Sequence, residues 1–355
     1  MKQKSTSSGV KEIARRANVS IATVDRVIHN RTGVSEKTRR KIDLIIREMN
    51  YQPNILASRL ASRKVFHFAI LIPRVSEETD YWEAPLNGIQ RATAAIKQYG
   101  INVDHYFYDL NDKKSFTRQT QIILKQKTDG VLMAPSFIEE AVHFAEECRK
   151  RNIPYVFINS DIPQQDSLCY IGPHLFQSGY LGAHLVNLGT SRKGKTLVVN
   201  ISREIDNHHH LLRKEDGFRS YFKDHGSPQE IIKLDIRQTH YQAVSRKLSK
   251  TLRDFPDITA IFVTNSRVST VASFLEKSGL ENILLIGYDF LRENVRYLEK
   301  GTISFLICQQ PEEQGYQGTM ALYDHLVLGT QIEKVHFMPI DIITKENYEF
   351  YQTAK

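Results

Sequence analysis

The sequence has little cysteine and no long apolar segment. Its three cysteines, Cys148, Cys169 and Cys308, are widely spaced and set in apolar surroundings. An odd number at such spacing favours buried thiols in a reducing compartment over disulfides, catalysis or metal binding. No apolar run approaches the roughly 20 residues that a membrane-spanning helix needs. The basic N-terminus has no apolar core behind it, so we expect no secretory signal and no membrane partner, and a cytoplasmic location.

The sequence also lacks the spacings that mark catalytic sites. It has no nucleophile elbow, no Ser-His-Asp order and no paired carboxylates, so we expect no enzyme, no catalytic residue and no cofactor. Residues 189–196 do fit the phosphate-loop pattern G-x-x-x-x-G-K-T. A phosphate loop follows a strand and opens a helix, whereas here a helical pattern precedes and a strand pattern follows. We therefore interpret the match as chance, with Gly189 capping the end of a helix.

A run of three histidines, His208, His209 and His210, could suggest a metal site. Consecutive residues on a helix point in different directions, and no cysteine or carboxylate spacing completes a ligand set. We therefore expect an exposed polar patch that opens a helix, and no metal.

Positive charge is concentrated at the N-terminal end of the chain. The formal net charge is +8, and residues 1–64 contain 15 Lys and Arg against 5 Asp and Glu. The remainder therefore carries a small negative excess. A merely soluble protein has no physical reason to segregate charge in this way, whereas a phosphate-binding domain does.

The basic segment has the periodicity of three short helices. A tight turn at Asn18-Val19 separates the first two, and Ser20 and Ser35 are placed to cap the second and third. This order is typical of a helix-turn-helix head, which we assign to residues 1–52. The apolar positions at helical spacing are Ile13, Ala14 and Ala17, then Val24, Val27 and Ile28, then Ile42, Ile45, Ile46 and Met49.

Three motifs occur in order in this segment: A-x-x-A-x-V-S-x-x-T-V-x-R-V, V-S-x-x-T-R and N-Y-x-P-N. Over about 55 residues the stretch closely resembles the head of the lac-repressor (LacI/GalR) family of transcription regulators. The resemblance implies that Ile21, Ala22 and Arg26 face base edges in the major groove, with Arg26 suited to a guanine. It implies DNA backbone contacts for Ser20, Thr23, Ser35, Thr38, Arg39 and Asn54.

Asp25 departs from the family pattern, which usually has serine at this position. A carboxylate facing a phosphate would be repelled, so Asp25 either reads a cytosine amino group, pairs with Arg26 or points into solvent. We place it among the DNA-binding residues and expect an altered operator preference.

Residues 53–64 form a predicted hinge segment. Residues 54–61 read as one amphipathic helix, and about eight residues are too few for stability alone in water. The resemblance implies that two such helices meet in the DNA minor groove, with Ala57 among the contacts and Leu60 as the wedge between base steps. A single leucine in another context would be a core residue.

From residue 65 onward, apolar strand-like runs alternate with helical patterns. Continuous apolar strands separated by helices predict parallel, doubly wound sheets covered on both faces, with a ligand at the carboxyl ends of the strands. We expect an α/β ligand-sensing domain of two subdomains, residues 65–162 with 310–335 and residues 163–309 with 336–355. The runs are 68–72, 131–134, 155–159, 196–201, 231–236, 260–264, 283–288 and 303–308.

The order of landmarks in this region resembles the periplasmic-binding-protein-like sensor of the same family. The resemblance implies ligand contacts for Asp161, Asn265, Asp289 and Gln309. The family usually has a basic ligand-contacting residue three positions before a Gly-Phe pair, here Gly217-Phe218. Lys214 occupies that position, and Arg213 lies one residue before it. Tyr81 and Trp82 are candidates for an aromatic wall, and Ser266 replaces a common aspartate, so no particular sugar follows.

We therefore expect a ligand-responsive regulator that binds double-stranded operator DNA as a homodimer or a higher oligomer. Repression of a carbohydrate-utilisation operon is the expected mode, with a sugar or sugar derivative as effector, although activation stays open. Two alternatives are a solute-binding protein for sugar transport, which would have a signal peptide and no basic head, and a nucleotide-binding enzyme acting through residues 189–196.

Overall fold

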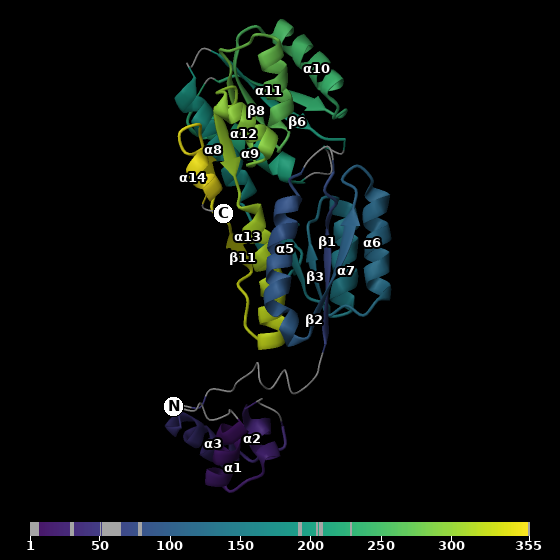
Figure 1. Cartoon of the computed structure of the whole chain (residues 1–355), viewed down its shortest axis with the longest axis vertical. Helices are drawn as coiled ribbons and strands as arrows, with labels where there is room; N and C mark the ends of the chain where they lie inside the picture. The colour runs from purple at the N-terminus through teal and green to yellow at the C-terminus, as the bar shows by residue number, and fades with distance from the viewer. Residues whose placement is uncertain are drawn as a thin grey trace. The chain divides into compact units, whose positions relative to one another are not determined.

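The computed structural model describes residues 7–28, 32–49, 51, 65–76, 80–190, 194–203, 205, 209–227 and 229–353 (Figure 1). The chain divides into two compact units, Met1–Val65 and Phe66–Lys355, which we call the head and the body. The predicted hinge residues Asn54, Ala57 and Leu60 lie outside the described residues. Within the described part, no helix has both the length and the apolar character needed to cross a bilayer.

The head is a bundle of three helices, α1 (Ser7–Ala17), α2 (Ile21–Ile28) and α3 (Glu36–Glu48). Asn18 adopts a left-handed conformation with φ 53°, which confirms the predicted tight turn between α1 and α2. The Lys41 Nζ donates to the Ala17 carbonyl at 3.0 Å and so satisfies the end of α1. The apolar positions predicted from helical spacing form the core, with Ile46, Met49 and Ile28 at its partly buried edge.

The first lobe of the body is built on a six-stranded sheet with strand order β11-β5-β4-β3-β1-β2. All of its strand pairs are parallel, as expected for strands connected through helices. Its elements are β1 (Phe66–Pro73), α5 (Glu83–Ile96), η1 (Lys97–Tyr99), β2 (Ile101–Tyr108), α6 (Lys113–Lys125), β3 (Gly130–Met133), α7 (Ile138–Lys150), β4 (Tyr155–Ile158), β5 (Cys169–Gly172), α13 (Pro311–Tyr323), the π-helical turn η3 (Asp324–Leu328) and β11 (Val335–Phe337).

The second lobe is built on a six-stranded sheet with strand order β12-β10-β9-β8-β6-β7. Its strands are parallel except for β12, which pairs antiparallel with β10. Its elements are α8 (Leu175–Gly189), β6 (Lys195–Ile201), α9 (His209–Asp224), β7 (Ile231–Ile236), α10 (Tyr241–Asp254), β8 (Ile258–Val263), α11 (Val268–Lys277), β9 (Leu284–Tyr288), α12 (Arg292–Glu299), β10 (Phe305–Cys308), β12 (Asp341–Ile343) and α14 (Tyr348–Thr353).

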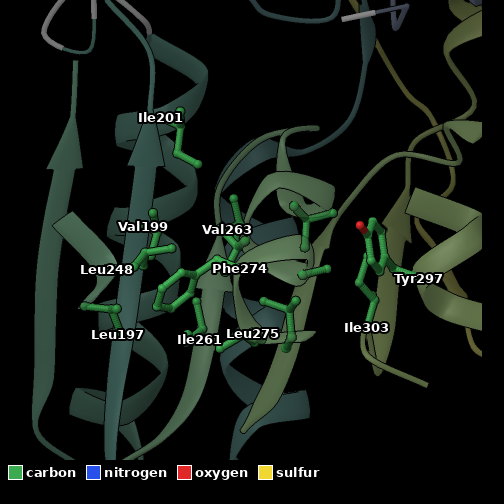
Figure 2. Packing of buried hydrophobic residues seen from close by; sticks show 14 of the residues in the cluster. Leu197, Val199, Ile201, Leu248, Ile261, Val263, Phe274, Leu275, Tyr297 and Ile303 are labelled. Atoms are coloured by element: carbon green, nitrogen blue, oxygen red, sulfur yellow. The ribbon is translucent and has the colours of Figure 1, made fainter. Parts of the chain in front are cut away.

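Helices cover both faces of each sheet, which confirms the predicted doubly wound architecture. Figure 1 shows α5 and α13 on one side of the first sheet and α6 and α7 on the other. In the second lobe, one core lies between the sheet and α8 and α9, and the other lies on the face of α10, α11 and α12. Figure 2 shows the second of these cores, in which β6 and β8 side chains pack on Leu248, Phe274 and Leu275. Removal of this apolar surface from water supplies the main stabilisation of the lobe.

The boundary between the lobes differs from the prediction. Strand β5 pairs with β4 through Val156 and Cys169, so the first lobe continues to about Gly172 and does not end at residue 162. Strand β11 also belongs to the first sheet, where Val335 pairs with Tyr170. Both strands are very short, and β11 is exposed, so neither has the continuous apolar run on which the prediction relied.

Each lobe contains one helix pair in which glycines bring two backbones into close contact. A Cβ on Gly88 of α5 would lie 1.9 Å from the Glu312 carbonyl oxygen of α13, and one on Gly315 would lie 2.1 Å from that of Pro85. In the second lobe, a Cβ on Gly179 of α8 would lie 1.9 Å from the Lys214 carbonyl oxygen of α9. Gly217 meets Phe176 in the same way. The crossing of α8 and α9 therefore fixes where α9, and with it Lys214, lies.

Candidate functional site

Helix α2 of the head buries one face and presents the other to solvent. Val24 and Val27 are 0% and 4% exposed and pack in the core of the head. Ile21, Ala22 and Arg26 are exposed, and Ile21 keeps 49% of its surface accessible. An apolar, a small and a cationic side chain on one face can meet thymine methyl groups and guanine acceptors in a major groove.

The two helices after the turn begin with the same capping arrangement. The Thr23 N–H donates to the Ser20 Oγ at 3.1 Å, and the Thr38 N–H donates to the Ser35 Oγ at 3.3 Å. Both predicted N-caps are therefore confirmed. Helix N-termini with hydroxyl groups favour phosphate oxygens, because the helix dipole and the first N–H groups attract anions. Ser20, Thr23, Ser35 and Thr38 thus lie where DNA backbone contacts are expected.

Part of the acidic charge in the head is neutralised locally. The Glu12 carboxylate lies 2.7 Å from the Arg15 Nη2 and 2.9 Å from the Arg16 Nε on α1. The hydrogen bonds from Arg15 and then Arg16 lower the pKa of Glu12 to about 2. Glu36 lies 3.6 Å from Arg40 in the first turn of α3. Because these acidic side chains are paired with arginines of the same helix, the excess of basic residues gives the head a positive electrostatic potential.

In the body, a cleft opens at the carboxyl ends of strands from both sheets. It encloses about 700 Å³, part of it open to solvent. Such an edge is where doubly wound sheets place their ligands. The lining residues are Tyr81, Trp82, Leu110, Asn111, Ser136 and Asn159 from the first lobe, and Ile201, Ser202, His210, Lys214, Asn265, Ser266, Arg267, Asp289 and Gln309 from the second.

Two aromatic side chains form the first-lobe wall of the cleft. Tyr81 and Trp82 are 6% and 4% exposed, and their rings meet edge to face with centroids 5.1 Å apart. The Tyr81 hydroxyl donates to the Asn159 Oδ1 at 2.8 Å. Burial, and next the nearby Asp289 carboxylate, raise the pKa of Tyr81 well above its usual range, so the hydroxyl stays protonated.

The second-lobe wall is held in an unusual backbone conformation. Asp289 has φ 73°, and such a left-handed residue is strained unless its surroundings hold it. The Asn294 Nδ2 donates at 3.0 Å to the carbonyls of Ser266, Tyr288 and Asp289, and so ties together the ends of β8 and β9. The Gln309 Nε2 donates to the Asp289 Oδ1 at 3.2 Å. The carboxylate is therefore oriented at the floor of the cleft.

Lys214 brings a cation into the cleft from α9. The side chain is 3% exposed, and its Nζ lies 3.5 Å from the centroid of the Tyr288 ring. Burial lowers the pKa of Lys214 to about 8, and the Asp289 charge opposes this shift. The Asn265 Nδ2 donates to the Ile201 carbonyl at 2.7 Å, which fixes the amide at the ends of β6 and β8.

Two predicted ligand residues lie elsewhere. Asp161 and Arg213 line a neighbouring cavity together with Tyr170, His174 and Phe176. The Asp161 Oδ1 lies 3.8 Å from the His209 Nδ1, so it joins the two lobes, while Arg213 pairs with Asp216 at 3.0 Å on the same helix. Six of the eight predicted residues, Tyr81, Trp82, Lys214, Asn265, Asp289 and Gln309, therefore meet in the cleft.

The histidine run is not the exposed patch that we predicted. His209 and His210 begin α9 and are both half-buried, His209 against Asp161 and His210 in the wall of the cleft. Their consecutive positions on a helix send them to different cavities. His208 lies outside the described residues.

Several cleft residues were not predicted, among them Ser136, Asn159, Ser202 and Arg267. Asn159 and Ser202 directly follow the carboxyl ends of β4 and β6, and Ser136 and Arg267 lie three and four residues after β3 and β8. This position after a strand is the signal that could have identified them. Asn159 ends the predicted run 155–159, and its φ of 66° turns the chain there, so that Asn159 and not Asp161 enters the cleft.

The phosphate-loop pattern lies in the predicted context. Helix α8 ends at Gly189, and β6 begins at Lys195. The C-cap is Thr190, so the predicted cap at Gly189 was wrong by one residue. Lys195 lies 3.4 Å from both Glu230 and Asp257, so carboxylates hold the lysine of the pattern. This order of helix, loop and strand is the reverse of the strand, loop and helix that a phosphate loop requires.

All three cysteines are buried and form no disulfide, as predicted. Burial raises the pKa of the Cys148 and Cys169 thiols to about 12, which disfavours the reactive thiolate.

Two family models match the chain. Residues 9–54 match "Bacterial regulatory proteins, lacI family", and residues 68–331 match "Periplasmic binding protein domain". The chain is 29% identical over 266 residues to the HTH-type transcriptional regulator DegA of Bacillus subtilis, covering 74% of each protein. It is 26% identical over 329 residues to the HTH-type transcriptional repressor PurR of Klebsiella pneumoniae, covering 90% of each.

Solved structures support the same relationship. A structure described as a LacI transcriptional regulator from Bacteroides fragilis superposes with a TM-score of 0.74 at 32% identity, covering 81% of this chain and all of that one. GanP, a glucose-galactose binding protein from Geobacillus stearothermophilus, superposes at 0.72 with 24% identity over 80% of this chain and 99% of its own. The second likeness concerns the fold of the body alone.

Proposed function

The chain belongs to the lacI family of bacterial regulatory proteins, and we propose that it represses a carbohydrate-utilisation operon as a homodimer on a near-palindromic operator. It is a DNA-binding, ligand-responsive transcription regulator. A two-fold dimer presents two heads to two half-sites, which is why a near-palindrome suits it. Repression is favoured because a relative that covers 90% of the chain, PurR, is named a repressor.

The observation that supports DNA reading most directly is the solvent face of α2. Ile21, Ala22 and Arg26 are exposed there, while the opposite face of the same helix is fully packed. A face that contributes nothing to the core is available for recognition, and an arginine in it can bind a guanine through two hydrogen bonds. Asp25 lies between these residues, so we propose that it shifts the base preference at one operator position.

The chemistry of the cleft supports a sugar or sugar derivative as effector. Two aromatic rings form one wall, and the amides and carboxylate of Asn265, Gln309 and Asp289 form the other. Rings cover the apolar face of a sugar, while oriented polar groups bind its hydroxyls. Because both lobes line the cleft, a bound effector would change their closure and, through the hinge segment, the fit to DNA.

The location and the absence of catalysis are also part of the proposal. Named relatives are transcription regulators, and DNA is their site of action, so we place the protein in the cytoplasm. We propose that the protein is not an enzyme, since residues 189–196 have the wrong order for a phosphate loop.

The test begins with selection of preferred operators from random DNA by the full-length protein. Arg26→Ala is expected to weaken binding to the selected operator by about 5- to 150-fold, because one bidentate base contact contributes roughly 1–3 kcal/mol. Binding to unselected DNA should change much less. Arg16→Ala is the matched control, since it removes one positive charge from an exposed, paired position on α1.

An Arg26→Ala protein that still selects the same operator with wild-type preference would show that α2 is not the reading helix. Leu60→Ala should weaken binding to the operator more than binding to unselected DNA, because a wedge acts only on the bent site. Equal losses on both DNAs would contradict the proposed wedge.

A further inference from the structure

The Lys214 side chain is almost wholly buried, and its ammonium group lines the cleft without a hydrogen-bond partner among the described residues. Lys214 is 3% exposed, lines the cleft and touches the Tyr288 ring. Within the part of the chain that the structure describes, no carboxylate forms an ion pair with it and no acceptor receives its protons. A cation that has lost most of its contact with water is costly unless an acceptor replaces that water, so this group favours an acceptor on the ligand.

The packing around Lys214 keeps the ammonium in this place. The Lys214 backbone is pressed against Gly179 at the crossing of α8 and α9. The Tyr288 ring is fully buried, and its hydroxyl lies 3.2 Å from the Ser178 Oγ of α8. One side of the ammonium therefore rests on the ring, and its other side faces the cleft.

The charges of the described lining favour an anion. The residues from the first lobe that line the cleft are uncharged. The second lobe contributes two cations, Lys214 and Arg267, against one carboxylate, Asp289. The Gln309 Nε2 donates to the Asp289 Oδ1 at 3.2 Å, so one oxygen of this single carboxylate already has a donor.

We propose that the effector carries an anionic group, a carboxylate or a phosphate, which binds the Lys214 ammonium. The inference rests on the proposed carbohydrate effector and narrows it to an acidic sugar. A neutral hydroxyl could accept one hydrogen bond from Lys214, but it would not offset the burial of the charge. An anion gives a charge-assisted hydrogen bond, which is roughly twice as strong as a neutral one.

The experiment compares matched pairs of compounds by titration calorimetry on the full-length protein at pH 7. The carboxylate pairs are D-glucuronate with D-glucose and D-galacturonate with D-galactose, and glucose 6-phosphate tests the phosphate. We expect at least one acidic compound to bind about ten- to a hundredfold more tightly than its neutral parent, as hydrogen bonds to charged groups imply. Comparison of the two acidic types identifies which anion the site takes.

Variants at Lys214 then test whether this residue causes the preference for the acidic sugar over the neutral one. Lys214→Met should abolish the advantage of the acid over the neutral sugar, while Lys214→Arg should keep most of it. Lys277→Met is the matched control, because the Lys277 Nζ also rests on a tyrosine ring, 4.2 Å from the centroid of Tyr241, but outside the cleft. Melting curves of each variant establish that it is folded.

Two results would overturn the inference and leave the proposed function standing: neutral sugars that bind as tightly as their acids, or an acid preference that survives in folded Lys214→Met. If no sugar binds while the protein still recognises its operator, the carbohydrate effector itself is wrong, and the acidic sugar falls with it.

Discussion

The two lobes of the body are alike in their packing and unlike in their charge. Each has a six-stranded sheet, helices on both faces and one helix crossing closed by reciprocal glycines. Yet the described lining of the cleft is uncharged on the first lobe and charged on the second. The shared features belong to the fold, because both lobes need them to pack, whereas the charges occur on one lobe alone, as the proposed role in ligand recognition would lead us to expect.

The similarity in packing predicts that both lobes depend on their close helix crossings, and this can be tested by replacing one glycine of each crossing with alanine. Gly179→Ala should destabilise the second lobe by about 3 kcal/mol or more, because the new Cβ meets a backbone carbonyl that can move only with its helix. Gly88→Ala should do the same to the first lobe. The gain of about 1 kcal/mol in helix propensity does not offset this clash. Calorimetric melting of the ligand-free protein measures both effects.

Gly189→Ala is the matched control on α8. Its Cβ would meet the end of the Leu284 side chain, which can rotate away, so the cost should stay within about 1 kcal/mol. Equal melting temperatures for Gly179→Ala and Gly189→Ala would show that the crossing is not close packed.

Most of the strands that could be predicted from the sequence are buried on both faces, although the half-buried edge strand β7 was also predicted, at residues 231–236. Residues 131–134, 260–264 and 283–288 are predicted apolar runs, and they overlap the strands β3, β8 and β9. Strand β2 was missed because it lies at the sheet edge and mixes His105 and Asp104 with apolar residues. Strands β11 and β12 have three residues each, too few for any periodicity to register.

The cleft was predictable only in part, for a related reason. The family resemblance identifies residues near the ends of strands, but the turn after each strand determines which of their side chains points into the cleft. Asn159 and Asp289 both have positive φ, and that turn sends Asn159 into the cleft and Asp161 toward His209. Such backbone reversals depend on tertiary contacts, such as the three donations by Asn294, which the local sequence does not reveal.

The difference in charge between the lobes predicts a pH-dependent stability that arises from Lys214. In the ligand-free protein the pKa of Lys214 is about 8, against 10.5 for an ordinary lysine, because burial disfavours the cation. Between pH 8 and about 10 the unfolded chain therefore binds more protons, and stability should rise with pH. Lys214→Met lacks this cost, so it should exceed wild type by up to about 3 kcal/mol below pH 8, with a gap that narrows above it.

Denaturant unfolding of both proteins at pH 7, 8.5 and 9.5 measures that gap. Tyrosine ionisation near pH 10 affects both proteins alike and cancels in the difference. Parallel stability profiles would mean that Lys214 is not buried as a cation, and the lobes would then not differ at the cleft in the way described.

The smallest expected effect concerns the contact between the lobes. Burial lowers the pKa of His209, and the Asp161 carboxylate opposes this shift from across the lobe boundary. A histidine with a lowered pKa loses stability as pH falls below its unfolded value of about 6.5. Asp161→Asn removes the opposing charge, so the variant should lose more stability than wild type between pH 7.5 and 5.5. Because Asp161 is 41% exposed, the added loss should stay below about 1 kcal/mol.

Melting temperatures at these two pH values measure the effect, with Asp166→Asn as the matched control. Asp166 also belongs to the segment after β4, but its partner is Lys334, whose hydrogen bond lowers the pKa of Asp166 below its usual range. The stability from that pair is present above the ordinary aspartate pKa, so it should be the same at pH 5.5 and 7.5. If Asp161→Asn shows the same difference from wild type at both pH values, then His209 does not sense Asp161. The 3.8 Å contact between His209 and Asp161 would then contribute no measurable coupling between the two lobes.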